Sequence, residues 1–184
     1  ASSNLLRFDG VKYGYRTSEQ VSDLRELYRK TRGEAFGVEP KLRMLMGIYL
    51  SAAQFDKGYY QRALKARALI RKDFEDIFDP KGNYRLDALL TPTTPSTAFP
   101  IGGVYGDSVL MQYSDQLTVT TNHAGIPGLS IPAGFDAGGL PIGVQFLGAD
   151  YQEGTLLRLA RAYEKVTADE SWRQRTPPVL EGAA

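Results

Sequence analysis

Apolar residues recur every three or four positions over residues 17–32 and again over residues 59–77, a spacing that predicts two amphipathic helices. Ser18 or Ser22 is available as the N-cap of the first helix, because a hydroxyl can accept from the free N–H groups of the first turn. Gly33 lies just beyond its predicted end, a common place for glycine. The first half of the chain is therefore predicted to be helical.

Between these two helices, residues 42–55 are apolar on almost every side of a predicted third helix. Such a helix should be enclosed by protein rather than lie on its surface. Arg43 is its only charged residue. Because a guanidinium keeps its proton and is costly to bury unpaired, an anion should meet Arg43. That anion is either a carboxylate of this protein or part of a ligand.

The second half of the chain contains short apolar and alternating runs that are typical of strands. Residues 134–139 are rich in glycine and are predicted to form the loop of a hairpin. In the strand after this loop, Ile142, Val144 and Phe146 should share one face, with Gln145 on the other. The predicted strands are residues 86–91, 129–133 and 142–147.

Two further helices are predicted in this half. Ser108 can cap a short helix that runs through Leu117 and presents Asp115 roughly opposite its apolar stripe. Residues 92–107, rich in Pro, Gly, Ser and Thr, precede it as a long loop of a kind that is often functional. The last helix is predicted over residues 153–166, with Leu156, Leu157, Ala160 and Tyr163 facing inward.

Helices and strands thus interleave, which favours an α/β fold with a mixed β-sheet flanked by helices. With 184 residues, of which 42% are hydrophobic, the chain is long enough for one substantial core. We therefore expect one compact region over residues 1–166 and a polar tail that frays over residues 167–184.

Composition then narrows the function classes. Lys and Arg total 22 against 21 Asp and Glu, so the net charge of +1 provides no general attraction to nucleic acid. The absence of cysteine and the single histidine exclude disulfides, thiol nucleophiles and zinc fingers. We expect neither a membrane span nor a signal peptide, and the composition is compatible with a cytoplasmic location. Because the chain does not begin with Met, we expect it to be part of a longer protein.

Few residues point to chemistry on their own. No P-loop, dinucleotide-binding, EF-hand or HExxH motif is present, and no serine and lysine are paired for nucleophilic attack. His123 precedes a glycine-rich turn, and a structural role is the better interpretation because no catalytic partners are identifiable. The basic row within residues 62–72 is followed at once by acidic residues, which favours a solvated helix face over an RNA site. Arg43 remains the strongest candidate.

Five segments of the chain carry further information: residues 8–14 (FDGVKYG), 32–37 (RGEAFG), 89–95 (LLTPTTP), 124–134 (AGIPGLSIPAG) and 140–146 (LPIGVQF). In this order they resemble the C-terminal part of amidase-signature enzymes, and the resemblance extends from residue 1 to about residue 166. Within that family it points to the glutamine-hydrolysing subunits of tRNA-dependent amidotransferases.

The resemblance implies a mixed sheet flanked by helices and a serine nucleophile that acts with a cis-bonded serine and a lysine. These three residues belong to the family's N-terminal part and match nothing here, so the chain would have no catalytic residue of its own and would be inactive alone. Arg43 falls where the family's glutamine-hydrolysing members have the arginine that binds the carboxylate of glutamine. Asp115 falls where they have the aspartate that binds its ammonium. A planar guanidinium suits a carboxylate, and an acceptor-only group suits an ammonium.

The resemblance also implies partners. These are the N-terminal part of the same amidase subunit, the other amidotransferase subunits, glutamine and, only indirectly, tRNA. ATP and Mg²⁺ are expected in a partner subunit, and no cofactor or metal in this chain. Two alternatives stay open: a fragment of a stand-alone amidase that acts on neutral amides, and a non-catalytic scaffold module. A neutral amide would need neither ionic contact, and a scaffold would bind no glutamine.

Overall fold

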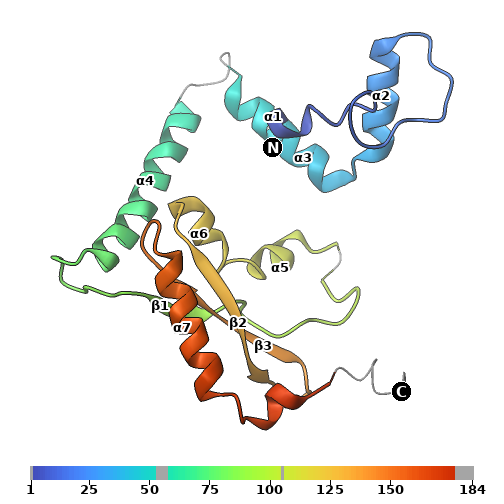
Figure 1. The fold of residues 1–184 in the computed structure, drawn as a ribbon. Helices are drawn as coiled ribbons and strands as arrows, with labels where there is room; N and C mark the ends of the chain where they lie inside the picture. Colours follow the sequence, from blue (N-terminus) through green and yellow to red (C-terminus); the bar gives the residue numbers. More distant parts are fainter. Residues whose placement is uncertain (1, 53–57, 105, 177–184) are drawn as a thin grey trace. The chain divides into compact units, whose positions relative to one another are not determined.

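The computed structural model describes residues 2–52, 58–104 and 106–176. The chain divides into two compact units, Ala1–Leu64 and Lys65–Ala184 (Figure 1). We call them the first and the second unit. In the described part of the chain, every helix is too short or too polar to cross a membrane.

The first unit is helical, and Arg32 joins its parts. The Arg32 Nη1 donates to the carbonyl oxygens of Leu5 and Phe8, at 2.8 and 2.9 Å. Its Nη2 approaches the sulfur of Met44 at 3.1 Å, and its guanidinium stacks over the Phe36 ring. One arginine thus connects three helices. The elements are α1 (Ser2–Leu5), α2 (Leu24–Ala35), α3 (Val38–Ser51) and the first turns of α4 (Gly58–Phe78).

Helix α2 starts later than predicted, because its N-cap is Asp23 rather than either of the predicted serines. The Asp23 carboxylate accepts from the Glu26 N–H at 2.7 Å. In return, the Glu26 carboxylate accepts from the N–H and hydroxyl of Ser22, at 2.8 and 2.7 Å. This reciprocal pair satisfies donors that the first turn leaves free.

The loop that precedes α2 folds back onto it. Gly10 lies against Thr31, which is only 1% exposed, and adopts the left-handed conformation with φ +76°. The Thr31 hydroxyl accepts from the Thr17 N–H at 3.2 Å. The Glu34 carboxylate accepts from the hydroxyls of Tyr15 and Thr17, at 2.7 and 2.8 Å. Much of the first unit is therefore held by polar contacts rather than by a large apolar core.

The prediction that residues 42–55 form an enclosed helix is wrong for its described part. Helix α3 does form, but the side chains of Leu45, Met46 and Ile48 are 65%, 53% and 57% exposed. Arg43 is exposed as well. Residues 53–55 of this prediction lie outside the described residues. The apolar pattern indicates which side chains the helix is able to bury. In the first unit, the neighbouring elements leave these side chains uncovered.

The second unit is built on a three-stranded sheet in the order β1-β3-β2, with both pairs antiparallel. The predicted hairpin is confirmed, and so is the α/β class. The described strands form no parallel pair, although the sequence predicted a mixed sheet. The elements are β1 (Leu89–Pro92), α5 (Ser108–Tyr113), α6 (Val119–Ala124), β2 (Gly128–Phe135), β3 (Pro141–Leu147), α7 (Glu153–Val166) and η1 (Ser171–Gln174).

Helix α7 covers one face of this sheet (Figure 1) and forms the core with it. Leu156 and Ala160 on α7 pack against Ile131 on β2 and Phe146 on β3. The predicted bounds of α7 are confirmed. Leu157 was predicted to face inward, but it is 60% exposed because it lies next to the narrow stripe of α7 that meets the strands.

The second half of α4 is attached to this unit by two of its arginines. The Arg67 Nε donates to the carbonyl of His123 at 2.7 Å. Arg71 donates to the carbonyl of Ala124 at 3.0 Å and pairs with Glu75 and Asp150. Hydrogen bonds to these carboxylates raise the pKa of Arg71. The basic row is therefore more than the solvated face that the sequence predicted.

Gly10→Ala should destabilise the chain by at least about 1 kcal/mol, because its Cβ would lie 2.7 Å from the Thr31 methyl and 2.9 Å from the Tyr15 carbonyl, at positive φ. Gly33→Ala is the matched control. Gly33 lies inside α2, where a Cβ would meet nothing within 4 Å, so this change should stabilise by about 0.5–1 kcal/mol. Urea unfolding of both variants measures the difference. Shifts of the same sign would contradict the close approach at Gly10.

The Glu26 carboxylate should make the chain sensitive to acid. Hydrogen bonds lower the pKa of Glu26 from 4.5 to about 2, and those from Ser22 contribute more than the one from Lys30. Because the folded state lowers this pKa, the resulting stability is complete above about pH 4.5 and is lost as the pH falls toward 2. Carbon-13 NMR titration of the Glu26 carboxyl carbon measures the pKa, and Glu26→Gln should flatten the stability profile in this range. Titration near pH 4.5 would rule out the cap geometry.

Candidate functional site

Asp115 lies in the turn between α5 and α6, with its carboxylate exposed to solvent. Its main-chain carbonyl accepts from the N–H groups of Thr118 and Val119, both at 2.9 Å, and so starts α6. In the described part of the chain, the carboxylate itself forms no hydrogen bond or ion pair. The turn thus fixes the backbone of Asp115 and leaves its negative charge available to a ligand.

A row of polar side chains crosses the sheet on the face opposite α7. Thr91 on β1 and Ser130 on β2 are the direct partners of Gln145 on β3. One residue beyond β1, the Thr93 hydroxyl lies 2.8 Å from the Ser130 hydroxyl. Gly143 makes this contact possible, because a Cβ there would lie 3.0 Å from the Thr93 hydroxyl oxygen. This polar row, Thr91, Thr93, Ser130 and Gln145, faces the side of the sheet that carries the Asp115 turn.

Gln145 joins the polar row to the Asp115 turn. Its side chain is only 4% exposed, and its Nε2 donates to the carbonyl of Leu117 at 2.9 Å. The prediction that Gln145 faces away from the apolar side of its strand is confirmed. The sequence did not indicate a function for this residue. The available signal was a lone polar residue in a strand whose following positions are Phe146 and Leu147, because a buried amide needs partners.

Arg43 lies on α3 in the first unit, and its guanidinium forms no hydrogen bond or ion pair with the described residues. The prediction that it is buried is wrong in this chain, since the side chain is exposed. Its predicted anion is not a carboxylate of the described part of the fold. Arg43 and Asp115 belong to different units, so their convergence on one ligand stays a prediction.

Two hydroxyl groups of the polar row contact each other. Among the described residues, neither the Thr93 nor the Ser130 hydroxyl forms a hydrogen bond with a lysine or a histidine. The ring of His123 instead contacts the Val119 carbonyl at 2.9 Å, which agrees with a structural role. Across the described residues, no three acidic or histidine side chains are grouped to hold a metal ion. The described part of the site thus offers polar groups that can bind a ligand.

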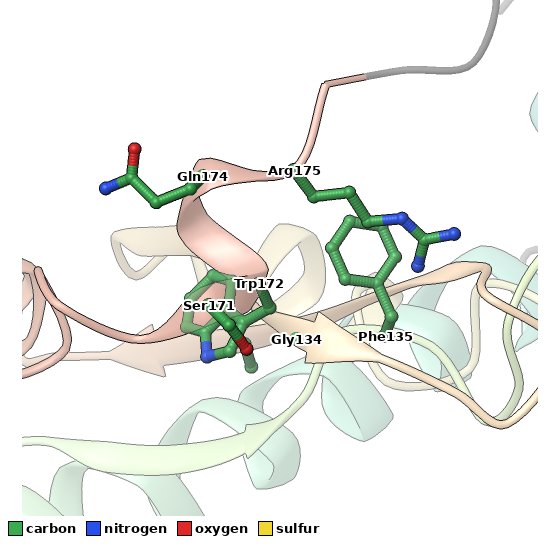
Figure 2. A pocket seen from close by; sticks show the side chains of 7 residues that line it. Gly134, Phe135, Ser171, Trp172, Gln174 and Arg175 are labelled. Carbon is green, nitrogen blue, oxygen red and sulfur yellow. The ribbon is translucent and has the colours of Figure 1, made fainter.

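A second candidate is an open groove of about 580 Å³ at the end of β2. Its wall is η1, so the first residues of the predicted tail pack on the sheet. The Arg175 side chain extends over the Phe135 ring (Figure 2), with the guanidinium 4.4 Å from the ring centre. Among the described residues that line it, Arg175 is the only ionisable one. The fraying predicted for residues 177–184 lies outside the described residues.

Comparison with known proteins relates this arrangement to a family. The family model described as Amidase matches residues 1–157. The A subunit of the glutamyl-tRNA(Gln) amidotransferase of Desulforudis audaxviator (strain MP104C) is 48% identical over 177 residues, which cover 96% of this chain and 34% of that protein. The chain therefore spans about a third of the length of the curated relatives it matches and corresponds to their C-terminal part.

Solved structures share the fold. The A subunit of the glutamyl-tRNA(Gln) amidotransferase from Thermotoga maritima matches with a TM-score of 0.55 and 35% identity, over 77% of this chain and 30% of that one. The native peptide amidase from Stenotrophomonas maltophilia matches with a TM-score of 0.60 and 25% identity, over 96% of this chain and 32% of that one. With a family model that covers most of its length and relatives aligned over nearly all of it, the chain belongs to the Amidase family.

Proposed function

We propose that this chain is the C-terminal part of the glutamine-hydrolysing subunit of a tRNA-dependent amidotransferase, where it supplies substrate-binding residues. The observation that carries the proposal is the high identity, over nearly the whole chain, to proteins named as the A subunit of glutamyl-tRNA(Gln) amidotransferase. The whole enzyme would release ammonia from glutamine for the amidation of Glu-tRNA(Gln) or Asp-tRNA(Asn). A cytoplasmic location is part of the same proposal.

In this proposal, Arg43 and Asp115 bind the two charged ends of free glutamine. The guanidinium can donate two parallel hydrogen bonds to the α-carboxylate, and the Asp115 carboxylate can accept from the α-ammonium. Both side chains are exposed and unpaired among the described residues, which leaves their charges free for a ligand. Holding both ends would direct the side-chain amide toward the nucleophile and lower the entropic cost of reaction.

The nucleophile and its base would come from the N-terminal part of the same subunit. The Thr93 and Ser130 hydroxyls hydrogen-bond to each other and to no lysine or histidine of the described residues, which is consistent with a binding role for this chain. The expectation that ATP and Mg²⁺ bind a partner subunit is part of the same proposal. Transfer of the ammonia would need that partner subunit, and tRNA would contact this chain only indirectly.

Arg43→Ala and Asp115→Asn in the full-length subunit, assembled with its partners, should each raise the KM for glutamine by about ten- to a hundredfold with little change in kcat. The reason is that each removes one charge-assisted contact that substrate and transition state share. Steady-state glutaminase assays measure both constants. Arg25→Ala and Asp87→Asn are matched controls, because both side chains are exposed and form no hydrogen bond or ion pair with the described residues.

The alternatives give different results in the same assay. An unchanged KM in both variants would contradict the glutamine site. Hydrolysis of uncharged amides by the full-length protein, with indifference to glutamine, would instead favour a stand-alone amidase, for which the likeness to the peptide amidase is the specific support. A full-length protein that neither binds nor hydrolyses any amide would favour the scaffold.

The exposed apolar face of α3 should bind the remainder of the same subunit. Alone, this chain should self-associate and bind the dye ANS, because Leu45, Met46 and Ile48 are each more than half exposed. Ile48→Lys should reduce both effects in the chain alone and should lower the Tm of the full-length subunit. Val166→Lys, at a position that is 85% exposed on α7, is the matched control. A monomeric, dye-free wild-type chain would overturn this prediction.

A further inference from the structure

Gln145 is the most deeply buried polar side chain of the polar row. It lies on the central strand of the sheet, between Thr91 and Ser130 on the two neighbouring strands. The burial of an unpaired amide is unfavourable, so the side chain must obtain hydrogen bonds from its surroundings. A hydrophobic residue would fill this position without the cost of burying a polar group, which raises the question of what the amide does.

The partners of Gln145 fix the orientation of its amide. Its Nε2 lies 2.9 Å from the carbonyl oxygen of Leu117 and 3.3 Å from that of Pro92. It also lies 3.0 Å from the Thr91 hydroxyl. Carbonyl oxygens only accept, so the NH₂ group and not the amide oxygen must face them. The side chain therefore donates to two different segments of backbone, the end of β1 and the turn before α6.

The bond to Leu117 has no substitute in the turn. The other hydrogen bonds of residues 114–118 are made within α5, the turn itself and α6. Within the described residues, the Gln145 amide is the only hydrogen-bond donor of the sheet that reaches these five positions. Leu117 follows Asp115 by two residues, and the turn between them starts α6. Through this hydrogen bond the sheet holds the turn that carries the Asp115 carboxylate.

We propose that Gln145 is a positioning residue for substrate: by holding the Leu117 carbonyl, it sets the place of the Asp115 carboxylate that receives the ammonium of glutamine. This inference rests on the proposed function, because it assigns Gln145 a part in the same site. Gln145 itself contacts no reacting atom. Its effect passes through Asp115 and concerns the ammonium end of the substrate alone.

Gln145→Glu tests the inference with almost no change in side-chain volume. It replaces the NH₂ group with a carboxylate oxygen, which is repelled by the carbonyls of Leu117 and Pro92. Gln145→Met is the second variant, because it removes the donor and keeps the bulk without a new charge. Gln61→Glu is the matched control, since it makes the same chemical change on the exposed surface of α4. The melting temperature of each variant reports whether it folds.

The experiment uses the full-length subunit assembled with its partners and two substrates. One is glutamine, and the other is glutaramate, which is glutamine without the α-amino group. Gln145→Glu should raise the KM for glutamine about tenfold and leave the KM for glutaramate nearly unchanged. Gln145→Met should change both KM values in the same way and by a similar factor. In combination with Asp115→Asn, Gln145→Glu should add little further loss, because both act on one contact.

The outcomes separate the two levels of inference. If Asp115→Asn raises the KM for glutamine but the folded Gln145 variants do not, the positioning role is wrong and the glutamine site stands. If the Gln145 variants raise the KM for glutamine and glutaramate equally, their role is structural only, which also overturns the proposal. If Asp115→Asn leaves the KM for glutamine unchanged, the proposed ammonium contact fails, and the role of Gln145 fails with it.

Discussion

The packing of α7 on one face of the sheet is the interaction on which the rest of the second unit depends. Leu156, only 2% exposed, fills the contact with Ile131 and Phe146, and burial of such a side chain contributes roughly 1.5–3 kcal/mol. Because this core uses the alternate residues of β2 and β3 that point to α7, the residues between them must point the other way. The polar row follows directly from this alternation.

The opposite face carries the polar row and is covered in part by the Asp115 turn. Gln145 links the two, because its nearly buried amide donates to backbone on β1 and on the turn that carries Asp115. Unlike an apolar contact, a hydrogen bond has a preferred direction. It can therefore keep the turn on the sheet and also set the position of the turn.

The first unit shows the opposite balance. Polar contacts through Arg32 and Glu34 connect its parts, while the apolar side chains of α3 remain exposed. The chain spans about a third of its relatives' length, and such faces would stay open wherever the other two thirds of those relatives supply the other half of a core. In the proposed enzyme, the helix that presents Arg43 to glutamine would therefore be completed by residues outside this chain, and the pocket would exist only in the whole subunit.

The sequence alone determined the hairpin, the bounds of α7, the opposite faces of Phe146 and Gln145, and the family, because periodicity and local motifs are properties of consecutive residues. It also identified Arg43 and Asp115 as candidates. It could not predict that α3 is exposed, that Leu157 faces outward, or that Arg71 and Gln145 hold backbone carbonyls far along the chain. Tertiary structure decided these features, because burial and hydrogen-bond partners depend on which distant segments meet. A pattern of consecutive residues shows only which side chains a segment is able to bury.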